Sequence, residues 1–240
     1  MSEQNIKQNS NNKKLIIFDF DGVIADTFKQ AYQASILASK EYHFIPFSSQ
    51  EEFYNDLNVT LQTAPKLVLN RFRKQGVFLG TKEIIYQLIN AKKFKHGILK
   101  YFGPILQESE YFPGIPNLLQ QLSAKSEMVI LSNNQASAIN LFLEKNNLKR
   151  YFTNVHGFDT TMVKTEALTN IIRSHGVKIE NVVFVTDMAR DVKDARPLKI
   201  PVLAVTYGYN TTQKIIKSRP AKIVDSVEEI YPALAEILKF

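Results

Sequence analysis

Four aspartates stand where buried strands are expected to end, and their spacing groups them into two pairs. Asp19 and Asp21 come at the end of the apolar run 14–20, and side chains two positions apart on an extended chain point to the same side. Asp187 ends a second apolar run, 181–187, and Asp191 follows about one helical turn later. If the two runs form neighbouring strands, the four carboxylates gather at one place. Such a cluster would repel itself without a cation.

The sequence limits any metal site to mainly oxygen ligands. The chain has no cysteine, which excludes a disulfide framework and a thiolate zinc site, and its four histidines are scattered. Magnesium prefers oxygen ligands, keeps several waters and accepts phosphate oxygens, so the pattern favours phosphoryl chemistry with Mg²⁺ as the cofactor. The plainer interpretation is that strand-end aspartates only cap helices or shape turns, and the second pair weighs against it.

The apolar runs also predict the elements that position these acids. Unbroken apolar runs are typical of parallel strands buried on both faces, and amphipathic segments between them are typical of covering helices. The alternation predicts an α/β fold with a doubly wound, mainly parallel sheet, in which a site lies beyond the carboxyl ends of the strands. The expected strands are 14–20, 127–133, 151–158, 181–187, 200–208 and 221–226, and the expected helices are 116–125, 135–146, 164–175, 191–198 and one from Val227.

An insert with helix signals and no convincing strand interrupts this alternation. Its helices are expected to begin at a capping-box pattern, formed by Ser48 with Glu51 or by Ser49 with Glu52, near Pro65, and near Thr81. Glycines and prolines mark the return to the sheet. We therefore expect a disordered tail at 1–13, an α/β core domain at 14–27 and 108–240, and an inserted α-helical cap domain at 28–107.

Charge and hydropathy bear on partners and location. The net charge is +7, and the segment 28–107 holds eleven Lys and Arg against five acids. A basic face attracts nucleic acid, an anionic membrane or a small phosphorylated substrate, and charge alone does not separate them from an ordinary solvated surface. No run approaches the roughly 20 apolar residues of a spanning helix, and the first fourteen residues lack the apolar stretch of a secretory signal. We expect a cytoplasmic protein.

The segment FDFDGVIADT, residues 18–27, resembles the first signature of the haloacid dehalogenase (HAD)-like hydrolases, Asp-x-Asp-x-Val/Thr. The later signatures are matched in order by Ser132 with Asn133, by Lys164 ahead of a helix, and by the second aspartate pair. The similarity covers about 14–240, and the tail PVLAVTYGYN resembles phosphoglycolate phosphatase-like members. This resemblance implies a HAD-like Rossmannoid core with a helical cap, in the branch of phosphoglycolate phosphatases and β-phosphoglucomutases.

The resemblance implies a catalytic role for five residues. Asp19 would be the nucleophile that attacks phosphorus and forms an aspartyl phosphate. Asp21 would protonate the departing oxygen and then activate the hydrolytic water. Ser132 would donate a hydrogen bond to the phosphoryl oxygens, and Asn133 would help through its backbone. Lys164 would neutralise charge on the phosphoryl group and orient the nucleophile.

The same resemblance implies a magnesium site. Its ligands would be the Asp19 and Asp187 carboxylates and the backbone carbonyl of Asp21, with Asp191 supporting the ion directly or through water. One departure bears on this site, because Thr186 stands where the fourth signature usually has glycine. No functional group is lost by that change, so the expected chemistry is kept.

Several alternatives remain beside a phosphatase of small phosphorylated metabolites. Dehalogenation and phosphonate cleavage go with replacement of the second aspartate of the first signature, and this chain retains Asp21. Mutases of the β-phosphoglucomutase type place a histidine where this chain has Ala31, which makes phosphotransfer the weaker alternative. A nucleic-acid-binding module on a retired hydrolase fold would use the basic insert, but the intact acids argue against it, so no nucleic-acid partner is expected.

Overall fold

The computed structural model describes residues 13–50, 52–53, 81–157 and 163–240. The chain divides into two compact units, Met1–Asp26 with Ser109–Phe240, and Thr27–Glu108. The expected disordered tail, up to residue 12, and the helix expected near Pro65 lie outside the described residues.

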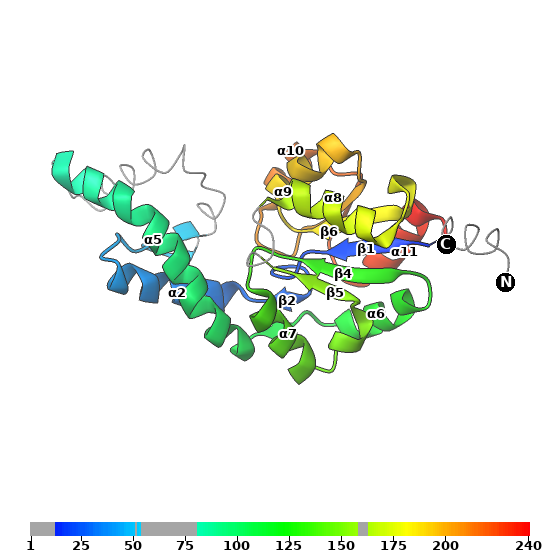
Figure 1. The fold of residues 1–240 in the computed structure, drawn as a ribbon, viewed down its shortest axis with the longest axis horizontal. Helices are drawn as coiled ribbons and strands as arrows, with labels where there is room; N and C mark the ends of the chain where they lie inside the picture. The colour runs from blue at the N-terminus through cyan, green and yellow to red at the C-terminus, as the bar shows by residue number, and fades with distance from the viewer. Residues whose placement is uncertain (1–12, 51, 54–80, 158–162) are drawn as a thin grey trace. The chain divides into compact units, whose positions relative to one another are not determined.

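A six-stranded parallel sheet forms the centre of the first unit (Figure 1). Its order is β5-β4-β1-β6-β7-β8, so the chain builds one side of the sheet outward from β1 and then returns to build the other. This reversal beside β1 defines the doubly wound fold that the sequence predicts. The strands are β1 (Leu15–Phe18), β4 (Glu127–Leu131), β5 (Asn154–His156), β6 (Val182–Thr186), β7 (Val202–Val205) and β8 (Lys222–Val224).

Strand β1 is the axis of the sheet. All four of its residues are fully buried, and Ile17 lies beside Val129 of β4 and Phe184 of β6. The apolar run that predicts this strand is longer than the strand itself. The run continues beyond the strand because Asp19 keeps one hydrogen bond of the parallel pairing, and the residues after it form a turn at the carboxyl edge of the sheet.

Helices cover both faces of the sheet (Figure 1). One face carries α8 (Lys164–His175), α9 (Ala189–Ala195) and α10 (Thr212–Ser218), and the other carries α6 (Ile115–Ser123), α7 (Ala136–Lys145) and α11 (Ile230–Leu238). On the first face, Leu168 of α8 and Val192 of α9 pack in one apolar cluster with Ile17 and Phe184. The sequence did not predict α10. The 3₁₀ helices of this unit are Lys149–Tyr151, Ile179–Asn181 and Arg196–Leu198.

A two-stranded antiparallel ribbon, which the sequence did not predict, closes the first unit where the chain leaves and re-enters it. Strand β2 (Ala25–Asp26) pairs with β3 (Glu110–Tyr111). The ribbon is anchored beside the sheet, because the Tyr207 hydroxyl donates a hydrogen bond to the carbonyl of Val23 at 3.1 Å. The Tyr207 ring also packs on Phe112, with 4.7 Å between ring centroids.

The second unit is helical in the part that the structure describes. Helix α2 (Phe28–Glu41) packs along α5 (Thr81–Ile105), which begins at the residue expected to start a helix. A polar cluster joins the two, because Glu41 accepts hydrogen bonds from Lys100 at 2.8 Å and from the Tyr101 hydroxyl at 2.5 Å. The 3₁₀ helix Leu106–Glu108 follows α5.

Ser49 and Glu52 form one of the two hydrogen bonds of the expected capping box, and the other is replaced by a bond to Ser48. The Ser49 hydroxyl accepts a hydrogen bond from the backbone N–H of Glu52 at 3.1 Å, and the Glu52 carboxylate accepts one from the N–H of Ser48 at 2.7 Å. Residues 50, 52 and 53 are helical. Among the residues that the structure describes, no helix combines the length and apolar character needed to cross a membrane.

Candidate active site

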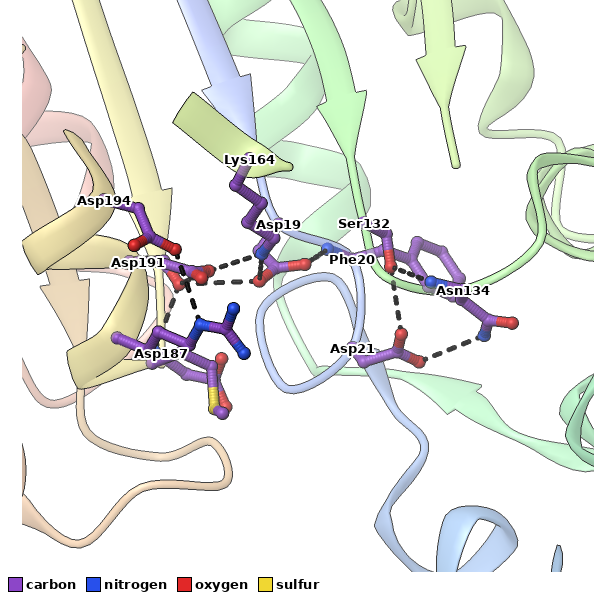
Figure 2. A network of polar contacts seen from close by, with 12 residues as sticks. Asp19, Phe20, Asp21, Ser132, Asn134, Lys164, Asp187, Asp191 and Asp194 are labelled. Carbon is purple, nitrogen blue, oxygen red and sulfur yellow. Dashed lines mark hydrogen bonds and ion pairs between the residues drawn. The ribbon is translucent and has the colours of Figure 1, made fainter. Parts of the chain in front are cut away.

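The end of β1 delivers Asp19 and Asp21 to the carboxyl edge of the sheet. Asp19 still belongs to the parallel pairing, because its N–H bonds to the carbonyl of Val185 at 2.8 Å, and it is buried. The chain then turns, with the carbonyl of Phe20 accepting bonds from three N–H groups that follow and Gly22 at a φ of +76°. The chain is therefore no longer extended after Asp19, so the two carboxyl groups do not point to the same side. They contact different partners (Figure 2).

Lys164 lies between two of the predicted acids. It is the first residue of α8, it is buried, and its Nζ lies 2.7 Å from Oδ2 of Asp19 and 2.5 Å from Oδ2 of Asp191 (Figure 2). The same Nζ lies 5.5 Å from the centre of the Phe184 ring. The other Asp19 oxygen, Oδ1, accepts a hydrogen bond from the N–H of Phe20 at 2.8 Å. The nucleophile expected from the sequence is thus held at both oxygens.

The pKa values of this group follow from burial and from neighbouring charges. Burial opposes the charged form of Lys164, but the carboxylates of Asp19 and Asp191 outweigh it and raise the pKa of Lys164. Burial raises the pKa of Asp19 well above its usual value; Lys164 lowers it, and Asp191 and Asp187 raise it further. Additional positive charge at this place would favour the ionised form of Asp19.

Asp21 belongs to a second set of contacts, on the side of β4. The Ser132 hydroxyl donates to Oδ2 of Asp21 at 3.1 Å and accepts a hydrogen bond from the N–H of Asn134 at 3.0 Å (Figure 2). The side-chain amide of Asn134 lies 3.5 Å from Oδ1 of Asp21. Asn134 is buried, whereas Asn133, which the sequence singled out, is exposed. The repeated asparagine in SNN was the only signal for this second residue.

Asp187 directly follows β6 and is fully buried. Its Oδ2 accepts a hydrogen bond from the N–H of Tyr209 at 2.5 Å. Two glycines make room for it, because a Cβ on Gly22 would lie 2.3 Å from Oδ2 of Asp187 and a Cβ on Gly208 would lie 2.3 Å from its Cβ. Burial raises the pKa of Asp187 to about 7, although the Tyr209 N–H opposes that shift. The sequence did not identify Tyr209 as a partner.

A cation fits the surroundings of Asp187. Its Oδ1 is buried and accepts no hydrogen bond, which is a costly arrangement unless a positive group approaches that oxygen. In the described part of the chain, no three acidic or histidine side chains stand close enough to enclose a metal ion by themselves. Magnesium does not need such a cage, because one or two carboxylates with waters and a substrate phosphate suffice. The residues present therefore suit this ion.

Three other residues near these strands have structural partners. The Thr186 hydroxyl donates to Oδ2 of Asp191 at 2.8 Å, a contact that the sequence did not predict. Asp194 forms an ion pair with Arg190, with 3.6 Å between Oδ2 and Nε, and Asp26 is exposed in β2.

Comparison with known proteins identifies the class. Residues 16–205 match the family described as haloacid dehalogenase-like hydrolase, so this chain belongs to that family of enzymes. The phosphoglycolate phosphatase of Synechococcus elongatus is 24% identical over 225 residues, which cover 93% of this chain and 98% of that protein.

Solved structures of similar fold support the architecture. A haloacid dehalogenase-like family protein of Streptococcus pneumoniae superposes with a TM-score of 0.74 at 18% identity, covering 92% of this chain and 98% of that one. A protein of Haemophilus somnus, described as a predicted phosphoglycolate phosphatase, gives a TM-score of 0.72 at 20% identity, covering 93% and 98%. At these identities the likeness establishes the fold alone.

Proposed function

We propose that this hydrolase is a magnesium-dependent phosphatase that cleaves a small phosphorylated metabolite through an aspartyl phosphate on Asp19. The observation that carries the proposal is the buried contact of 2.7 Å between Nζ of Lys164 and Oδ2 of Asp19 at the end of β1. Fixed positive charge beside a carboxylate nucleophile is what attack on a phosphate ester requires, because it is in place before negative charge develops.

The proposed reaction has two steps. In the first, a carboxylate oxygen of Asp19 bonds to phosphorus while the bond from phosphorus to the ester oxygen breaks, and protonated Asp21 gives its proton to that oxygen. In the second, ionised Asp21 takes a proton from water as the water oxygen bonds to phosphorus, which releases inorganic phosphate and restores the Asp19 carboxylate.

The contacts of Ser132 and Asn134 with Asp21 explain how this carboxyl group is kept apart from the proposed nucleophile. The Ser132 hydroxyl at 3.1 Å and the Asn134 amide at 3.5 Å draw the Asp21 carboxyl group toward β4, while Lys164 holds Asp19 on the other side. Two chemically alike residues thus have different surroundings, which suits one to attack and the other to transfer protons. Ser132 is also placed to donate to a phosphoryl oxygen once substrate is bound.

The resemblance to the family supplies the residues proposed for the ion. Asp19 and Asp187 would supply carboxylate oxygens, and Asp21 its backbone carbonyl. Asp191 would support the ion directly or through water, while its Oδ2 also contacts Nζ of Lys164. When bound, magnesium withdraws charge from the phosphoryl oxygens and so favours attack on phosphorus.

The name of the Synechococcus elongatus relative supplies the first substrate to test. That protein, a phosphoglycolate phosphatase, aligns with this chain over nearly its whole length. We propose 2-phosphoglycolate as the leading candidate among small phosphate esters, with the helical unit Thr27–Glu108 selecting the substrate.

The test is a release assay for inorganic phosphate with the full chain and a panel of phosphate esters that includes 2-phosphoglycolate. We expect hydrolysis that depends on Mg²⁺ and stops on chelation, and none with the Asp19→Asn protein. Activity that survives chelation, or that Zn²⁺ alone restores, would contradict the proposed site. Preference for an ester other than 2-phosphoglycolate would remove the substrate proposal and leave the reaction standing.

A further inference from the structure

Thr186 ends β6 within the layer that holds Lys164. It is fully buried, and because side chains two positions apart on a strand share a face, it lies on the same face of the sheet as Phe184. Helices α8 and α9 cover that face, where Leu168 and Val192 pack in one apolar cluster with Phe184. A hydroxyl group in this layer is shielded from water, so each hydrogen bond that it makes has a defined geometry.

The contacts of the Thr186 hydroxyl fix its orientation. Its Oγ1 lies 2.8 Å from Oδ2 of Asp191 and 3.5 Å from Oδ2 of Asp19, and it accepts a hydrogen bond from the N–H of Met188 at 3.1 Å. A hydroxyl has one hydrogen to donate, and the shorter distance assigns it to Asp191. The bond from Met188 keeps the hydroxyl from turning away.

Two donors therefore meet on one oxygen. Oδ2 of Asp191 accepts from Thr186 at 2.8 Å and from Nζ of Lys164 at 2.5 Å, and the same Nζ reaches Asp19 at 2.7 Å. A carboxylate held by one flexible lysine can rotate about its side-chain bonds. A second donor, fixed to the strand, removes that freedom and so fixes where the lysine is held.

We infer that Thr186 is a positioning residue, whose hydroxyl holds Asp191 in place and thereby keeps Lys164 against the nucleophile Asp19. A glycine at this position has no side chain with which to make the contact. The inference rests on the proposed phosphatase activity for its kinetic consequence. The expected effect on Mg²⁺ binding does not depend on turnover, because Asp191 would also support the bound ion.

A purely structural role has to be separated from this one. The bond from the N–H of Met188 to Thr186 orders the turn before α9, so loss of the hydroxyl could lower stability alone. Thr165 offers a control, because its hydroxyl donates to the backbone carbonyl of Asp194 at 3.0 Å, and Asp194 is not one of the proposed site residues. Thr165→Val removes a comparable hydrogen bond between α8 and α9.

The experiment compares Thr186→Val, Thr186→Ser and Thr165→Val in the full chain. Valine keeps the shape of threonine without the hydroxyl, and serine keeps the hydroxyl. For each variant, kcat and KM are measured with p-nitrophenyl phosphate at saturating Mg²⁺. The thermal unfolding midpoint of the metal-free protein is also followed as Mg²⁺ is added, which reports binding of the ion without turnover.

We expect Thr186→Val to lower kcat by about tenfold or more with little change in KM, since a hydrogen bond to a charged group is lost, and to raise the Mg²⁺ concentration needed for half the thermal shift. Thr186→Ser should recover most of both, and Thr165→Val should change only the metal-free midpoint. The inference would be overturned if Thr186→Val and the parent had the same kcat and the same response to Mg²⁺. It would also be overturned if Thr186→Val lowered only the unfolding midpoint of the metal-free protein. A parent protein that cleaves no ester would instead count against the proposed function, and the Mg²⁺ titration would still decide this inference.

Discussion

The ammonium group of Lys164 lies 2.7 Å from a carboxylate oxygen of Asp19, although 145 positions separate the two residues along the chain. The sheet order brings them together, since the start of α8 reaches the carboxyl edge of the strands beside β1. Both groups are buried, so each is the main compensation for the other's loss of water.

Removal of this lysine should affect both catalysis and folding. In Lys164→Met, Asp19 and Asp191 lose their shared partner, and we expect a loss of at least about 10²-fold in kcat. We also expect the free energy of unfolding to fall by about 3–5 kcal/mol at neutral pH, because buried charges are left uncompensated. Urea unfolding checks this, with Lys193→Met on the exposed side of α9 as the control. An unfolding free energy equal to that of the control would refute the pairing.

Asp19 and Asp21 should lose activity in different ways when each is changed to asparagine. Asp19→Asn removes the nucleophile, so no phosphoenzyme forms, even from an activated ester. Asp21→Asn keeps the nucleophile and loses the proton donor, at a cost of roughly 10²- to 10⁴-fold. With p-nitrophenyl phosphate, whose leaving group needs little protonation, the first step should partly recover in that variant.

Mass spectrometry of the acid-quenched proteins follows this difference directly. An acid-stable, hydroxylamine-sensitive phosphoryl adduct should be found on Asp19 in the Asp21→Asn protein, because water still lacks its base. The same adduct should be absent from Asp19→Asn. Appreciable turnover by Asp19→Asn, or an adduct in that protein, would end the covalent mechanism.

Gly208 should tolerate no side chain. A Cβ there would lie 2.4 Å from the carbonyl oxygen of Gly22 and 2.5 Å from Oδ2 of Asp187, so backbone must move. We expect Gly208→Ala to lower the free energy of unfolding by about 1–3 kcal/mol and to weaken the response to Mg²⁺. Gly176→Ala is the control, since its φ of +62° costs about 1–2 kcal/mol while nothing lies within 4 Å of the added carbon. An unchanged Mg²⁺ response in Gly208→Ala would argue against Asp187 as a ligand.

His156 should make the fold less stable in mild acid. It ends β5, its Nε2 is buried without a hydrogen bond, and burial lowers its pKa, with a smaller effect from the charge of His175. Above the usual histidine pKa of about 6.5 the ring is neutral in both states and contributes nothing. As the pH falls below that value, the unfolded chain binds a proton more readily, so stability is lost.

Urea unfolding across this range tests the effect. The free energy of unfolding should fall less steeply from neutral pH to about pH 5 in His156→Leu than in the parent, and the two slopes should agree above about pH 7.5, where neither state binds the proton. Identical slopes throughout would show that His156 titrates alike in both states.

The part of the site that depends on strand ends could be predicted from the sequence. Asp19, Ser132 and Asp187 follow apolar runs, and a parallel sheet brings the carboxyl ends of its strands to one edge. Lys164 was found only through the resemblance, because its place in the order of the family signatures is what distinguishes it from the other lysines. The structure places all of them within the same neighbourhood, although their roles in the reaction remain proposals.

Turns and very short elements could not be predicted in the same way. The direction of Asn134 depends on the backbone of the turn after β4, and periodicity says nothing about which asparagine of a pair faces inward. Strands β2 and β3 have two residues each, too few to show an alternating pattern. The strands were also overestimated, because apolar residues continue past Phe18 into the turn that carries Asp21.

The ribbon formed by β2 and β3 makes the helical unit, in topological terms, the loop of a β-hairpin. Asp26 and Glu110 are direct partners in that ribbon, so the chain leaves the core and returns to it at adjacent points. A segment of any length inserted between these two residues would leave their pairing intact. The reason is that the entropic cost of loop closure is only a little higher for a long loop than for a short one. The helical unit is therefore a replaceable insertion, and other segments could be placed there while the aspartates of the candidate site keep their positions in the core.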